Sequence, residues 1–287
     1  MTTKILSGLY QSVYNLAAPI TTLSITASGY LGGGLIAAGA GAYSIVSHGT
    51  ISGSSFGVSL AGNGSVDNRG LIHASSGSGV YLRQGGVVTN GSAVATASLI
   101  AGTTGVMAGG LAARVTNFGS ILATGAGVEL RDAAGTLANY GLVSSTSATL
   151  AAVGLLDGGV VINGSDTRTG ARIQGAYGVD IEGAVGSVSN FGTILARGAY
   201  YYLDRAVFLE AGGAVTNGGA LDTGALIDGP VAVEIDGAAG TVTNHGTIGG
   251  LVTIIGVYLR QGGLVTNAGP AALIGGYAGV EIANDSG

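Results

Sequence analysis

A motif that recurs about every 25 residues constrains the fold of this chain more than any other feature. Its clearest copies are Gly79-Val-Tyr-Leu-Arg-Gln-Gly-Gly-Val-Val-Thr-Asn90 and Gly256-Val-Tyr-Leu-Arg-Gln-Gly-Gly-Leu-Val-Thr-Asn267. Weaker copies lie between and around them, and their first apolar residues are Val58, Val80, Val106, Val128, Val153, Val179, Val207, Val233, Val257 and Val280. Self-similarity at such a period indicates a repeat architecture in which neighbouring units stack.

Each copy contains three short alternating pieces separated by glycine and asparagine, as in Val179-Asp-Ile181, Val242-Thr-Asn244 and Thr247-Ile248. Alternation in runs of three to five residues between turn formers predicts short half-buried strands. Three strands in about 25 residues predict one coil of a parallel β-solenoid, in which each strand pairs with its counterpart about 4.8 Å along the axis. We expect about ten coils, with the repeats over residues 45–287 and an N-terminal cap and first coil over residues 1–44.

The composition agrees with this fold and excludes several others. The 57 glycines suit tight corners, and a charged content of 9% suits stacked positions where like charges would repel. The chain has no cysteine for a disulfide scaffold, and no apolar run approaches the roughly 18 residues of a transmembrane helix. A net charge of −5 with scattered arginines argues against nucleic acid as a partner.

An asparagine closes every complete copy of the repeat. We expect these side chains to form a structural ladder that passes amide hydrogen bonds from coil to coil, rather than a ligand site. The members are Asn68, Asn90, Asn117, Asn139, Asn163, Asn190, Asn217, Asn244 and Asn267.

The coils differ in the segment that comes after the asparagine. Some turn at once, as in Asn117-Phe-Gly-Ser-Ile121, whereas others insert several residues, as between Asn90 and Leu99, Asn163 and Ile173, and Asn217 and Leu226. Such insertions should project from a single corner, and in repeat proteins they often form the binding face.

The two ends depart from the repeat. An i, i+4, i+8 spacing is followed by Ile5, Leu9 and Val13 and, one position along, by Leu6, Tyr10 and Tyr14, which predicts a short amphipathic helix within residues 1–25. The chain stops at Gly287, just after the strand at Val280 begins an eleventh coil. Either it is part of a longer protein or this open edge pairs end to end with another copy.

Acidic residues gather on one outer face in the second half of the chain. Asp180, Glu182, Glu210, Glu234 and Asp236 are predicted to lie within three coils. Several carboxylates together are what a calcium site uses, so calcium is a possible ligand there, although no cofactor is required. The favoured interpretation is a solvated acidic surface, partly compensated by flanking arginines.

The longest interval between copies contains Tyr200, Tyr201, Tyr202, Asp204 and Arg205. Aromatic rings beside an acid and a base form the platforms on which sugars stack, whereas alternating tyrosines also make an ordinary strand. Catalysis is not expected. The only histidines are His48, His73 and His245, and His48 and His245 occupy equivalent turn positions where other coils carry Phe118, Phe191 or Arg69, so the position tolerates other residues. A polysaccharide lyase or hydrolase stays open as the enzymatic alternative.

The pattern Gly-Val-x-Leu-x-x-Gly-Gly-x-Val-Thr-Asn-x-Gly-x-Ile resembles the repeats of bacterial surface proteins, namely autotransporter passenger domains and filamentous-haemagglutinin-like adhesins. The resemblance covers residues 45–287 and implies a right-handed parallel β-helix at the cell surface or outside the cell. We therefore expect a structural adhesin, stalk or self-assembling fibre subunit that associates with itself or with surface glycans or proteins. The alternative is a carbohydrate-binding or polysaccharide-degrading β-helix.

Overall fold

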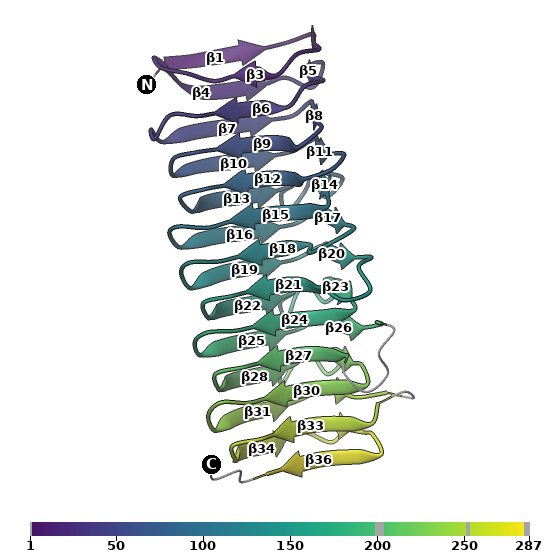
Figure 1. The fold of residues 1–287 in the computed structure, drawn as a ribbon. Coiled ribbons are helices and arrows are strands. Elements are labelled where there is room, and N and C mark those ends of the chain that lie inside the picture. The colour runs from purple at the N-terminus through teal and green to yellow at the C-terminus, as the bar shows by residue number, and fades with distance from the viewer. Residues whose placement is uncertain (1, 199–203, 251–252, 284–287) are drawn as a thin grey trace.

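The computed structural model describes residues 2–198, 204–250 and 253–283 of the chain. Within these residues every regular element is a β-strand, and the 36 strands form three parallel sheets of twelve strands each. The coils stack in sequence order into an elongated rod with the termini at opposite ends (Figure 1). The predicted parallel β-solenoid class is therefore confirmed. No helix in the described ranges has the length and apolar character needed to traverse a membrane.

Every third strand belongs to the same sheet, so one coil takes one strand from each. Sheet A consists of β1 Thr2–Leu6, β4 Ile20–Ile25, β7 Tyr43–Ser47, β10 Gly64–Asn68, β13 Gly86–Asn90, β16 Ala113–Asn117, β19 Gly135–Asn139, β22 Gly159–Asn163, β25 Gly186–Asn190, β28 Gly213–Asn217, β31 Gly240–Asn244 and β34 Gly263–Asn267. Sheet B consists of β2 Leu9–Tyr10, β5 Tyr30–Leu31, β8 Thr50–Gly53, β11 Leu71–Ala74, β14 Leu99–Gly102, β17 Ser120–Ala123, β20 Leu142–Ser145, β23 Arg172–Gly175, β26 Thr193–Ala196, β29 Leu226–Asp228, β32 Thr247–Ile248 and β35 Leu273–Ile274. Sheet C consists of β3 Tyr14–Asn15, β6 Leu35–Ala37, β9 Phe56–Leu60, β12 Ser78–Leu82, β15 Thr104–Ala108, β18 Val128–Leu130, β21 Ala151–Leu155, β24 Tyr177–Ile181, β27 Arg205–Leu209, β30 Val231–Ile235, β33 Ile255–Leu259 and β36 Ala278–Ile282.

Neighbouring coils pair without a change of register over the repeat. In sheet A, Val215 pairs with Val242 and Asn217 with Asn244, and in sheet C, Val207 pairs with Val233. Equivalent residues therefore lie above one another in columns along the rod, about 4.8 Å apart.

The inward-pointing columns form one continuous apolar core. Over the repeat, sheet A contributes mostly valine, sheet B mostly isoleucine, and sheet C a valine followed mostly by a leucine or isoleucine. These side chains are fully buried except in the last coil, where Val265 and Ile274 are partly buried and Val280 and Ile282 are exposed. Examples from two neighbouring coils are Val115, Ile121, Val128, Leu130, Leu137, Val143, Val153 and Leu155. The burial of each aliphatic side chain stabilises the folded state by about 1.5–3 kcal/mol. Because this burial is repeated in each coil, it is the main contribution to stability.

The rod has twelve coils rather than about ten, because the segment before the first recognisable repeat also winds into coils β1–β3 and β4–β6. The amphipathic helix predicted within residues 1–25 is wrong. Of the proposed apolar stripe, Ile5, Leu9, Tyr10 and Val13 are exposed and Tyr14 is half-buried, and only Leu6 is fully buried. The edge of β4 offers β1 a parallel hydrogen-bonding partner, and Gly8 at a φ of 100° breaks the helical path.

Four of the sheet A strands, β13, β22, β28 and β34, start with a glycine of positive φ. Gly213 has a φ of 137°, and a Cβ built on it would lie 2.0 Å from the carbonyl oxygen of Gly186 in the preceding coil. No other residue type fits such a position without moving the backbone. The close coil-to-coil approach at this corner therefore depends on the repeated glycine.

Candidate functional site

The asparagines that end the sheet A strands form an unbroken amide column. From Asn68 to Asn244, each Nδ2 donates to the Oδ1 of the asparagine in the next coil, at 2.7 or 2.8 Å. The eight donating side chains are fully buried, and only the last acceptor, Asn267, is exposed. The column occupies the corner between sheets A and B along most of the rod.

The same amides also tie down the backbone of the turn. Asn139 Nδ2 donates to the carbonyl oxygens of Gly141 and Arg172, and its Oδ1 accepts the N–H of Gly141. Because every polar atom of the side chain is used internally, the asparagines are structural and present no free group to a ligand.

Three insertions project from this corner, as predicted. They comprise residues 91–98, 164–171 and 218–225, and are here called the corner insertions. Each begins with a glycine of positive φ, namely Gly91, Gly164 and Gly218, and each closes a short turn: Ser92 with Ala95, Ser165 with Arg168, and Gly219 with Asp222. In the coils that turn at once, the same position carries a bulky side chain such as Phe118 or Tyr140.

The first two corner insertions contact each other across the intervening coils. Arg168 Nη2 donates to the carbonyl oxygen of Ala93 at 3.0 Å, and its guanidinium lies 5.6 Å from the ring centre of Phe118. Phe118 stacks on Tyr140 with ring centres 5.0 Å apart. Val94 and Leu221, at the tips of the first and third corner insertions, are 96% and 90% exposed. At this corner, therefore, Arg168 is held by the first insertion and by Phe118, while the apolar side chains of Val94 and Leu221 are exposed to solvent.

On the outer face of sheet C the predicted solvated acidic surface is only partly present. Glu234 belongs to the outward column, yet its side chain is 3% exposed because Arg205 and Arg260 cover it. Both arginine Nε atoms donate to the carboxylate, the Arg260 bond at 2.5 Å. The guanidinium groups also stack on the rings of Phe208 and Tyr258. Glu234 is therefore the centre of a closed ion-pair cluster.

The other predicted acids lie on consecutive coils, as β24, β27 and β30 place Glu182, Glu210 and Asp236 in one column. Glu210 accepts the N–H of Gly183, and Asp236 accepts the N–H of Gly237 and approaches Arg260 at 3.8 Å. Over the described ranges, no three acidic or histidine side chains converge in a way that would hold a metal ion.

A hollow of about 380 Å³ opens on sheet C where β18, β21 and β24 run side by side. We call it the sheet C hollow. Its floor is low at Gly154, because the outward column reads Glu129, Gly154, Asp180 across these strands and the glycine has no side chain. Leu150, Leu156 and Tyr177 stand around it, and Glu182 lies beside Asp180. A glycine between two carboxyl-bearing residues thus leaves room for a small ligand group.

Asp180 has an altered acidity in this setting. Burial, together with the charges of Glu182 and Glu210 and a hydrogen bond with Glu182, raises the pKa of its carboxyl to about 7 against the lowering effect of Arg205. Its Oδ1 is buried without a hydrogen-bond partner. A perturbed carboxyl in a hollow marks a candidate functional position.

The predicted sugar platform cannot be assembled from the structure. Tyr200, Tyr201 and Tyr202 lie outside the described residues. Asp204 is fully buried, and Arg205 is engaged with Glu234 and Phe208.

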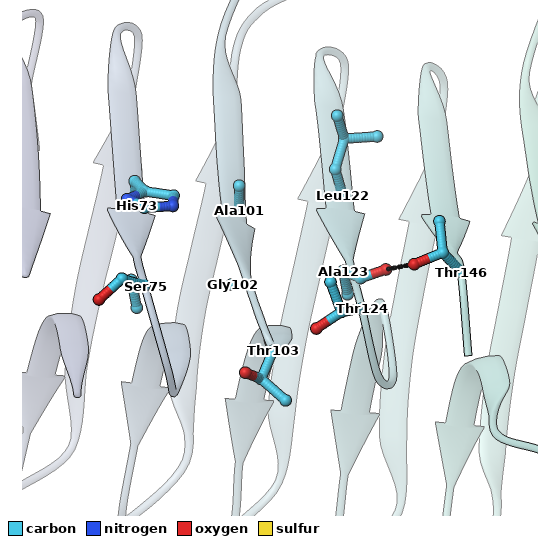
Figure 2. A pocket seen from close by; sticks show the side chains of 10 residues that line it. His73, Ser75, Ala101, Gly102, Thr103, Leu122, Ala123, Thr124 and Thr146 are labelled. Carbon is cyan, nitrogen blue, oxygen red and sulfur yellow. Dashed lines mark hydrogen bonds between the residues drawn. The ribbon is translucent and has the colours of Figure 1, made fainter. Parts of the chain in front are cut away.

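A second hollow, of about 280 Å³, lies on the outer face of sheet B. Figure 2 shows His73, Ala101 and Leu122 side by side on β11, β14 and β17, with hydroxyl residues below them and the 3.4 Å bond from Thr146 Oγ1 to the carbonyl oxygen of Ala123. His73 is its only ionisable side chain, so it offers little chemistry. His48 and His245 lie elsewhere, at the turn after the asparagine position.

The sequence reasoning missed the sheet C hollow. Gly154 was visible as the one glycine in an otherwise larger outward column, but the loop that raises Leu150 beside it had no recognisable pattern.

Comparisons of the chain with protein-family models, with curated proteins and with solved structures found no match.

Proposed function

We propose that the chain is a structural β-solenoid that works as a rigid cell-surface or extracellular rod, in the role of an adhesin, stalk or fibre subunit. The corner insertions are its contact surface. The resemblance of the repeat to autotransporter passenger domains and filamentous-haemagglutinin-like adhesins agrees with this role.

The observation that carries the proposal is the bond between Arg168 and Ala93, which joins insertions from coils that are three apart. Such contact requires that the coils between keep a constant register, and the buried asparagine column lies directly beneath and maintains it. The rod therefore holds exposed apolar tips at fixed spacing, which suits multivalent contact with a surface.

Adhesion of the purified chain, coupled to beads, tests the proposal. Wild-type beads should be retained under flow on glass, on immobilised glycans or on a layer of the same chain. Combined Val94→Ser and Leu221→Ser substitutions should remove most of the retention without lowering the melting temperature. Leu111→Ser is the matched control, because Leu111 is 54% exposed and lies outside the corner insertions.

Two results would overturn the proposal. One is the absence of wild-type retention on all three surfaces. The other is equal loss in the control variant, which would show that any exposed apolar residue supports the adhesion.

A further inference from the structure

The sheet C hollow has the size and the mixed lining of a small-ligand site. At about 380 Å³ it falls within the range of roughly 300–1,000 Å³ that is usual for ligand pockets. Leu150 and Leu156 supply apolar walls, and Ala126, Ala151 and Gly154 keep the floor low. The hollow is independent of the corner insertions, which belong to the corner between sheets A and B.

Its charges are not balanced. The charged groups around Asp180 are Glu182 on its own strand end, Glu129 two coils before it, and Arg205 and Glu210 in the next coil. Glu129 is paired with Arg131, and Arg205 is paired with Glu234. Within the described part of the chain, neither Asp180 nor Glu182 forms a salt bridge. Two adjacent carboxyl groups therefore lack a dedicated positive charge.

We propose that the sheet C hollow binds a primary alkylammonium group, such as the end of a lysine side chain, with Asp180 and Glu182 receiving the ammonium and Leu150 and Leu156 packing against the alkyl stem. An ammonium has three hydrogen-bond donors and no acceptor, and ionised carboxylates are acceptors only, so the donors of the ligand match the acceptors of the site. Charge-assisted hydrogen bonds of this kind are stronger than neutral ones.

A neutral sugar fits the lining less well. Sugar hydroxyls need donors as well as acceptors, and the charged groups aimed at this hollow are carboxyls. The buried Oδ1 of Asp180, which has no hydrogen-bond partner, is an acceptor awaiting a donor. Because burial keeps Asp180 largely neutral below pH 7, an incoming cation must also ionise it, and binding should strengthen as the pH rises.

Titration calorimetry of the full chain tests this site with two amines, n-butylammonium and Nα-acetyl-lysine methylamide. The neutral matched probe is Nα-acetyl-norleucine methylamide. We expect at least one amine to bind and the norleucine compound not to bind. Affinity should fall at least tenfold from pH 8 to pH 5, where both amines keep their charge because the pKa of an alkylammonium is about 10.4.

Variants locate the binding. Asp180→Asn and, separately, Glu182→Gln should each weaken it at least tenfold, whereas Glu281→Gln should not change it, because Glu281 is exposed on β36 far from the hollow. Binding of both amines would indicate that the hollow accepts a lysine borne on a chain, and binding of butylammonium alone would indicate a free amine. The proposal is overturned if neither amine binds, if Asp180→Asn binds as the wild type does, or if cellobiose binds as tightly as the amines.

Discussion

Asn139 donates from Nδ2 to Oδ1 of Asn163 across 2.7 Å, and both side chains are inaccessible to solvent. Asn139 in turn accepts from Asn117 at 2.8 Å, so each amide in the column is held from both sides. The removal of one member would leave a donor in one neighbouring coil and an acceptor in the other without their partners. An unsatisfied buried polar group costs about 1–3 kcal/mol, so the column makes adjacent coils mutually dependent.

We predict that Asn139→Ala lowers the free energy of unfolding by about 3 kcal/mol, since several buried groups lose their partners together. Chemical denaturation measures the change. Asn267→Ala is the matched control and should cost less than about 1 kcal/mol, because Asn267 is exposed and receives only one ladder bond. An unaltered midpoint in Asn139→Ala would contradict a stabilising role for the column.

Substitution of Glu234 should open the ion-pair cluster on sheet C. We expect Glu234→Gln to lower stability by about 2 kcal/mol, because two arginines lose a charged acceptor that is itself buried. The hydrogen bond from Arg260 to Glu234 raises the pKa of the Arg260 guanidinium above its usual value, so Arg260 stays charged at any working pH. Glu281→Gln, in the same column but exposed, should be neutral in the same thermal melts.

Asp180→Asn should stabilise the protein in alkaline but not in acidic solution. The carboxyl pKa is about 7 in the folded chain against 3.8 for the unperturbed group, so between these values the folded state binds more protons and stability falls as the pH rises. An uncharged asparagine avoids this cost. We expect the variant to melt roughly 5 °C above the wild type at pH 8 and within about 1 °C of it at pH 3.5.

Two outcomes would contradict that assignment. One is an equal difference at both pH values, which would attribute the effect to packing. The other is a titration of the Asp180 carboxyl near pH 4 in a carbon-13 nuclear magnetic resonance experiment.

Arg168→Ala should loosen the corner without unfolding the rod. Its bond to Ala93 and its contact with Phe118 are near the surface, so the loss of stability should stay below about 1 kcal/mol. Hydrogen–deuterium exchange should instead become faster at Ser92 and Ala95, which close the turn of the first insertion. Arg172→Ala, an exposed arginine on β23, is the control, and equal acceleration there would argue against the brace.

The repeat predicts the architecture because each coil contributes one strand to each of the three sheets, so the sequence of one coil describes nearly the whole fold. Val128, Val153 and Val179, chosen from the sequence as equivalent, are paired strand to strand in the structure. The pattern failed where it was absent: residues 2–37 carry no closing asparagine, yet they coil because the edge of each finished coil is a template for the next strand.

Side-chain surroundings were harder to predict than strand positions. Alternation shows that Glu234 and Asp180 point away from the core, but not that arginines from both neighbouring coils cover one and that a glycine leaves space beside the other. Both outcomes depend on side chains from two or three neighbouring coils, which are about 25 residues apart in sequence and meet only in the fold. They also depend on loops such as that of Leu150, which do not follow the repeat.

The constant register of the sheets has a consequence for how such a protein can change. Insertion of a whole coil between two sites would move one away from the other by a single step of about 4.8 Å along the axis while leaving each site intact within itself. The distance between the sheet C hollow and the tip at Leu221 is therefore adjustable in discrete increments. Evolution or protein engineering could therefore change the separation of two sites on this rod by adding whole coils between them, without redesigning either site.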